Sequence, residues 1–70
     1  MKMFDLHGVK HSDVTDIMID VCSKYAPPFI VITGKSGQMK RIVSFAVSKF
    51  GFEAHDDVGN FGRVVIRESR

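Results

Sequence analysis

The chain has 70 residues, which allows one small domain that must be held together by packing alone. Hydrophobic residues make up 44% and charged residues 26%, so the composition excludes a disordered or fibrous protein. Ten basic against eight acidic side chains give a net charge of +2, an excess too small to identify a partner. The single cysteine, Cys22, excludes an internal disulfide and predicts a reducing, cytoplasmic location. No apolar run approaches the ~18 residues of a membrane helix, so we expect a soluble protein without a membrane partner.

The first half of the chain contains three predicted elements. Residues 2–6 alternate between apolar and polar side chains, which predicts a strand. Apolar residues recur at steps of three and four over residues 14–25, which predicts a helix with Ser12 as its N-cap. The pair Pro27-Pro28 is expected to end that helix. The β-branched run Phe29–Ile32 then predicts a central strand.

The second half contains the other three. Apolar residues at helical spacing over residues 39–50 predict a second helix, with Gly51 as its C′ cap. Residues 52–55 and 63–67 alternate and predict two strands joined by a hairpin turn at residues 59–62. The order βαβαββ predicts a single two-layer α/β domain over residues 1–70, with a mixed four-stranded sheet and both helices on one face.

The predicted topology brings two loops to one edge of the sheet. A strand, a helix and a second strand in the same sheet imply parallel strands with a right-handed crossover. The loops after Leu6 and after Ile32 therefore open at the same edge, where open α/β sheets bind their ligands. We expect residues 5–11 and residues 33–41 to form a site together.

Asp5 and His7 are the candidate catalytic groups in the first loop. Residues two apart in a strand share a face, and a carboxylate can orient an imidazole as a general base or acid. The alternative interpretation is that both are solvated side chains on the open face of an edge strand. Gly8 and His11 follow at the same edge as candidate phosphate contacts, although His11 could equally serve only to begin the helix.

The second loop has the sequence Thr33-Gly34-Lys35-Ser36-Gly37 and is typical of an anion-binding turn before a helix. Residues 35–52 contain four basic and no acidic side chains, and three of the four, Lys35, Lys40 and Arg41, lie near the start of that segment. The whole net charge therefore comes from this segment, which favours RNA or DNA as partner. Alternatively, the loop needs glycine only to turn, and Lys40 and Arg41 are merely solvated.

Together these stretches resemble the Smr (small MutS-related) domain family. The resemblance rests on Phe4-Asp5-Leu6-His7-Gly8, on Ile30-Val31-Ile32-Thr33-Gly34-Lys35, and on a Gly-rich turn before the last strand. It spans nearly the whole chain and implies a fold like the C-terminal domain of translation initiation factor three, with endonuclease activity. It further implies that Asp5 and His7 are the catalytic pair and that Thr33, Gly34 and Lys35 form the phosphate-side loop. Ser36 stands where the family usually has its second glycine, and Gly37 follows one place later.

Two functions remain open from the sequence. The first is a hydrolase that cleaves phosphodiester bonds in RNA or structured DNA, with His7 as general base or acid oriented by Asp5. Lys35 and the N–H groups of residues 34–38 would then stabilise the developing charge. Cleavage of RNA would need no cofactor, whereas DNA lacks the 2′-hydroxyl and would favour a divalent metal. The second is a non-catalytic module, a monomer or weak homodimer, that binds nucleic acid or a ribosomal surface through residues 33–41.

Overall fold

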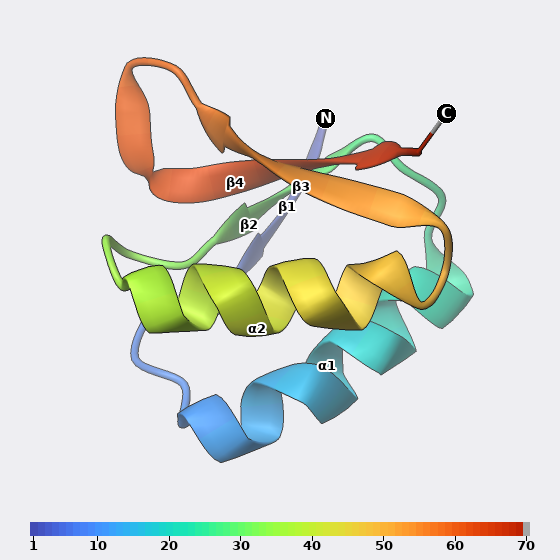
Figure 1. Ribbon diagram of the computed structural model, residues 1–70, viewed down its shortest axis with the longest axis horizontal. Coiled ribbons are helices and arrows are strands. Elements are labelled where there is room, and N and C mark those ends of the chain that lie inside the picture. The colour runs from blue at the N-terminus through green and yellow to red at the C-terminus, as the bar shows by residue number, and fades with distance from the viewer. Residues whose placement is uncertain (70) are drawn as a thin grey trace.

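The computed structural model describes residues 1–69 and shows six elements in the predicted order (Figure 1). They are β1 (Lys2–Asp5), α1 (His11–Lys24), β2 (Phe29–Ile32), α2 (Gly37–Ser48), β3 (Phe52–Asp57) and β4 (Asn60–Glu68). The four strands form one sheet in the order β1-β2-β4-β3. The predicted α/β fold with a mixed four-stranded sheet is therefore confirmed.

Strand pairing places the last strand in the middle of the sheet. β1 and β2 are parallel, whereas β4 is antiparallel to both of its neighbours, β2 and β3. At one edge the register aligns Asp5 of β1 with Ile32 of β2 and Ile32 with Arg63 of β4. This edge, where β1 and β2 end, is the one at which the sequence predicts a site.

Both helices cover the same face of the sheet, below the strands in Figure 1. The most fully buried side chains are Phe29, Met18, Ile66, Val14, Val31, Val43 and Val47, drawn from α1, α2, β2 and β4. Cys22 belongs to this core, and burial raises the pKa of its thiol. Cys22 therefore contributes to packing, because a buried neutral thiol is a poor nucleophile.

The ends of both helices differ from the predictions. α1 begins at His11 and not after Ser12, because the carbonyl of Lys10 already accepts the N–H of Asp13 at 2.9 Å and closes the first turn. α2 spans Gly37–Ser48 and not residues 39–50, and because Lys49 is its C-cap, Gly51 lies one residue beyond the C′ position predicted for it. Gly51 has the positive φ of +76° that lets the chain turn into β3. Within residues 1–69, neither helix is long and apolar enough to cross a membrane.

In the β3–β4 hairpin, the strands are longer and the turn between them is shorter than predicted. The strands extend to Asp57 and begin again at Asn60, so the turn consists of Val58 and Gly59 and not of residues 59–62. Gly59 supplies the positive φ of +93° at the tip. The glycine at position 62 suggested a turn, whereas it lies inside β4, where its backbone approaches another loop closely.

Candidate functional site

Asp5 and His7 form a hydrogen-bonded pair on the surface. Oδ1 of Asp5, the last residue of β1, lies 2.5 Å from Nδ1 of His7. The same oxygen accepts the backbone N–H of His7 at 3.2 Å, so the carboxylate also closes an Asx turn. The side chains are 66% exposed for His7 and 54% for Asp5. Because no group within residues 1–69 hydrogen-bonds Nε2 of His7, this nitrogen can exchange a proton with a bound molecule.

A tight turn over residues 6–9 presents the His7 ring. Leu6 is buried in the core and donates its N–H to the carbonyl of Ile32 at 2.8 Å, which fixes the start of the turn to β2. The N–H of Val9 returns to the carbonyl of Leu6 at 3.0 Å, and Gly8 has φ +83°. The third position of a type II turn needs a positive φ, which glycine adopts without strain, so the geometry of the turn explains the glycine at position 8. His7 occupies the exposed second position.

The hydrogen bond with the His7 side chain lowers the pKa of Asp5 below its ordinary value of 3.8, against a smaller opposing effect of desolvation. The carboxylate therefore stays ionised wherever an imidazole titrates and remains an acceptor for Nδ1–H. Since the pKa is lower in the folded chain, the pair stabilises the fold above pH 3.8. That stabilisation is lost as the pH falls through the folded-state pKa.

Replacing His7 with alanine should raise the pKa of Asp5 back toward its ordinary value, because the main group that lowers it is removed. Carbon-detected NMR titration of the Asp5 side-chain carboxyl measures this directly. A His55→Ala variant should leave the Asp5 titration unchanged. An Asp5 pKa that is the same with and without His7 would show that the pair does not persist in solution.

Gly34 brings the second loop against His7. Its φ of +67° is a conformation that favours glycine, and a Cβ added there would lie 3.7 Å from Cβ of His7. Lys35 follows immediately along the chain. The turn after β1 and the loop after β2 thus lie side by side at the edge of the sheet.

The start of β4 is a third segment of this site. The carbonyl of Gly62 accepts the N–H groups of Thr33 at 3.1 Å and Gly34 at 2.9 Å, and Asn60 Oδ1 accepts the N–H of Gly62 at 3.1 Å. The N–H of Gly34, expected to face an anion, is therefore already used. The backbone N–H groups of residues 35–38 have no acceptor within the described chain and remain available at the start of α2.

The two hydroxyls of the loop hold its backbone. Thr33 is almost fully buried, and its Oγ1 donates to the carbonyl of Gly34 at 2.7 Å. Ser36 is the N-cap of α2, where its hydroxyl accepts the N–H of Met39 at 3.1 Å and stabilises the helix by about 0.5–2 kcal/mol. Both hydroxyls therefore hold the backbone of the loop in place.

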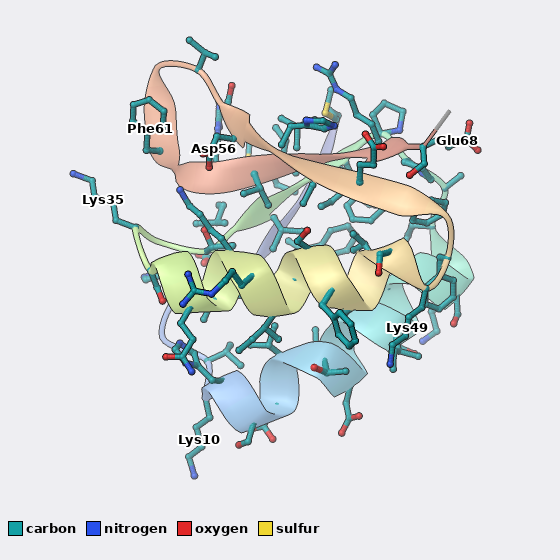
Figure 2. The ribbon with its side chains drawn as sticks, viewed as in Figure 1. Lys10, Lys35, Lys49, Asp56, Phe61 and Glu68 are labelled. Atoms are coloured by element: carbon teal, nitrogen blue, oxygen red, sulfur yellow. The ribbon has the colours of Figure 1, made fainter. Side chains whose placement is uncertain are left out.

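Two of the four cations in the basic segment point elsewhere. Nζ of Lys40 lies 3.0 Å from Oδ1 of Asp56 in β3, and the Lys40 side chain is only 20% exposed. Lys49 lies at the far end of α2, with Nζ 5.0 Å from the centre of the Phe45 ring (Figure 2). Neither is placed with His7.

Lys35 and Arg41 are the cations that stay with the loop. Both are exposed, and neither forms an ion pair within residues 1–69. Lys35 projects away from the body of the protein in Figure 2. Nη1 of Arg41 lies 3.8 Å from the position that a Cβ on Gly37 would take, so the guanidinium lies over the first turn of α2. His11, half-buried, begins α1 two residues beyond the turn.

A second histidine–carboxylate pair lies on β3. Nε2 of His55 is 2.9 Å from Oε1 of Glu53, and both side chains are about half exposed. β1 and β3 are the two outermost strands of the sheet, on opposite sides of it, so this pair is remote from His7. On the neighbouring β4, Nε of Arg63 is held 2.5 Å from Oδ2 of Asp57. Within residues 1–69, no three histidine, cysteine or acidic side chains gather as a metal site would require.

The Asp5–His7 pair lies on open surface. A hollow of about 320 Å³ is lined by Met1, Pro27, Pro28, Arg67 and Glu68. Another, of about 210 Å³, is lined by Lys40, Arg41, Ser44, Ala54, Asp56 and Val64, between α2 and the sheet. Neither is lined by Asp5 or His7. An open surface suits a polymer that passes over the protein better than a small enclosed ligand.

The contact made by Gly62 was missed from the sequence. The sequence predicts Gly62 in the hairpin turn, whereas its carbonyl holds the loop after β2. A glycine within a strand pattern often marks a place where another backbone comes close, and this was the only available signal.

The candidate site therefore combines the turn over residues 6–9, the loop over residues 33–37 and the start of β4, all at the left end of Figure 1. The arrangement places the imidazole of His7, oriented by Asp5, on a turn that lies against Gly34, and the exposed Lys35 follows Gly34 along the chain. No protein-family model, curated protein or solved structure matches this chain.

Proposed function

We propose that the chain is an Smr-like endonuclease that binds nucleic acid and cleaves phosphodiester bonds in RNA or structured DNA. The observation that carries the proposal is the 2.5 Å contact between Asp5 and His7 on a turn that lies against Gly34. This geometry supports acid–base catalysis because Asp5 orients the ring while Nε2 stays accessible. The resemblance of both loops to the Smr family supports the same function.

On RNA the attacking group is the 2′-hydroxyl next to the scissile phosphate. His7 Nε2 accepts the hydroxyl proton as the 2′-oxygen bonds to phosphorus. The bond from phosphorus to the 5′-oxygen breaks, and the protonated ring returns the proton to that leaving oxygen. The products are a 2′,3′-cyclic phosphate and a 5′-hydroxyl. Asp5 accepts Nδ1–H throughout and stabilises the imidazolium that forms.

The loop supplies the positive potential that this reaction needs. Negative charge builds on the phosphoryl oxygens as the fifth bond forms, and fixed donors stabilise it most effectively. Lys35, the guanidinium of Arg41 and the N–H groups of residues 35–38 are the donors that the chain offers there. The N-terminus of α2 adds its partial positive charge.

RNA is the substrate that the residues of this chain can cleave by themselves. DNA has no 2′-hydroxyl, so water would have to attack, and a divalent metal would supply its activation. We assign the reaction to the cytoplasm, because the only cysteine, Cys22, is a buried free thiol.

The test is incubation of the chain with end-labelled single-stranded RNA, with and without a chelator. We expect cleavage that persists in the chelator and leaves 2′,3′-cyclic phosphate ends. Products with other ends would exclude attack by the 2′-hydroxyl. No cleavage of RNA or of branched DNA in the presence of Mg²⁺ would exclude the endonuclease.

A non-catalytic binding module is the second candidate. It is favoured by the exposure of Lys35 and Arg41, which have no carboxylate partner in the part of the chain that the structure describes. Exposed cations of this kind suit a phosphate backbone whether or not it is cut. The partner would be nucleic acid or a ribosomal surface. A module of this kind would tolerate loss of His7, whereas an endonuclease would keep binding and lose turnover.

Replacing both Lys35 and Arg41 with alanine should weaken RNA binding and reduce the slope of log K against log salt concentration by about 2. Each lost phosphate contact removes roughly one released counterion. Titrations at several salt concentrations measure the slope. Lys49→Ala, which removes a cation at the other end of α2, should change neither quantity. An unchanged slope in the double variant would show that phosphates bind elsewhere.

A further inference from the structure

Phe61 is an exposed aromatic side chain next to the candidate site. It lies in β4 directly before Gly62, with 59% of its surface exposed, and Val58 at the hairpin tip is 91% exposed. Single exposed apolar residues are common and by themselves indicate nothing. Phe61 differs from most exposed apolar residues because hydrogen bonds hold the backbone on both sides of it in place.

Hydrogen bonds of the neighbouring residue Gly62 connect the backbone at Phe61 to the loop after β2. The Gly62 N–H donates to Asn60 Oδ1, which bridges the two neighbours of Phe61. The Gly62 carbonyl accepts from Thr33 and Gly34, so Phe61 and Lys35 each lie one residue away from this junction. Figure 2 shows both side chains at the same end of the molecule. The ring is therefore presented to solvent from a rigid base beside the cationic loop.

The two acidic residues next to the hairpin turn, Asp56 and Asp57, are paired with cations. Asp56 contacts Lys40 at 3.0 Å, and Asp57 contacts Arg63 at 2.5 Å. Each carboxylate is thus compensated by a cation from α2 or β4. A negatively charged polymer can approach the hairpin without meeting unpaired carboxylates on these two residues.

We propose that Phe61 is a stacking platform for an unpaired base of single-stranded RNA whose neighbouring phosphate is bound by the loop at Lys35. This inference rests on the proposed function and names its substrate class. A phenyl ring stacks on any base and tolerates sequence, whereas a base inside a duplex is already stacked on its neighbours. A cationic loop beside an exposed aromatic ring is the combination that proteins use to bind single-stranded nucleic acid.

The experiment measures binding of a fluorescein-labelled ten-nucleotide oligoadenylate and of an RNA duplex of equal length. His7→Ala is the parent chain, so that neither probe is cut. Phe61→Ala should weaken single-strand binding about 5- to 150-fold and leave duplex binding unchanged. Phe61→Trp should retain the affinity, whereas Phe61→Leu, which keeps apolar bulk without an aromatic face, should lose it.

Phe45→Ala is the matched control, since Phe45 is similarly exposed but lies on α2 against Lys49. It should bind as the parent does. Far-ultraviolet circular dichroism verifies that each variant is folded.

Outcomes separate the two proposals. Parental affinity in Phe61→Ala, or equal loss for both probes, would overturn the stacking platform and leave the endonuclease intact. Selective single-strand loss in Phe61→Ala, with no cleavage by the unmodified chain, would support the platform and overturn the endonuclease.

Discussion

Replacing His7 with alanine is expected to slow RNA cleavage by about 10²- to 10⁴-fold while RNA binding is retained. Within the turn over residues 6–9, His7 has the only side chain that can accept a proton from the 2′-hydroxyl. The proposed phosphate contacts come from residues 35–38 and not from the ring, so the substitution should leave binding intact. Single-turnover rates at saturating protein measure the chemical step, and titration of uncleaved RNA measures affinity.

The chain provides its own control for this experiment. His55 is also bonded to a carboxylate two residues away and is similarly exposed, but it lies on β3 at the opposite edge of the sheet. His55→Ala should therefore cleave at the rate of the unmodified chain. Equal rates for His7→Ala and the unmodified chain would remove His7 from the mechanism, and the binding module would then be the better description.

Replacing Phe29 with alanine is expected to lower the free energy of unfolding by about 3–5 kcal/mol. Phe29 is almost completely buried, and its ring packs edge-on against Phe4 with centroids 5.4 Å apart. A domain this small has a total stability toward the lower end of about 5–15 kcal/mol, so much of the variant should be unfolded at 37 °C. Urea titration followed by circular dichroism measures the change.

Phe45→Ala separates burial from the mere loss of a phenyl ring. Phe45 is 65% exposed on the outer surface of α2, and its removal should change stability by no more than about 0.5 kcal/mol. If both variants lost the same stability, the packing of the helices on this face of the sheet would be wrong.

The six elements could be predicted because their apolar residues follow two distinct periods. Val14, Met18 and Val21 recur at helical spacing and are all buried, whereas Val64 and Ile66 alternate along β4 and belong to the same core. Periodicity is local, so it can be read without knowledge of the fold. The proximity of His7 and Gly34 also followed from sequence, since parallel strands end at one edge.

Contacts between distant segments could not be predicted. The sequence predicts Lys40 as a phosphate contact because it lies in a basic segment, but it does not predict that the amine lies 3.0 Å from Asp56, sixteen residues later in the chain. The hydrogen bond from the N–H of Gly34 to the carbonyl of Gly62 is a second contact between segments far apart in the sequence. Both contacts depend on how β4 inserts beside β2, and local sequence does not specify that register.

The position of β4 determines when the chain can fold during its synthesis on the ribosome. β4 separates β2 from β3 although it is the last of the four strands to be synthesised, and it carries Val64 and Ile66 of the core. A nascent chain that has reached only Asp57 lacks the strand that joins the two halves of the sheet. Folding must therefore wait until residue 68 has left the ribosomal exit tunnel. If the chain is the nuclease proposed above, this order of assembly keeps it inactive toward the messenger RNA and the ribosome that produce it.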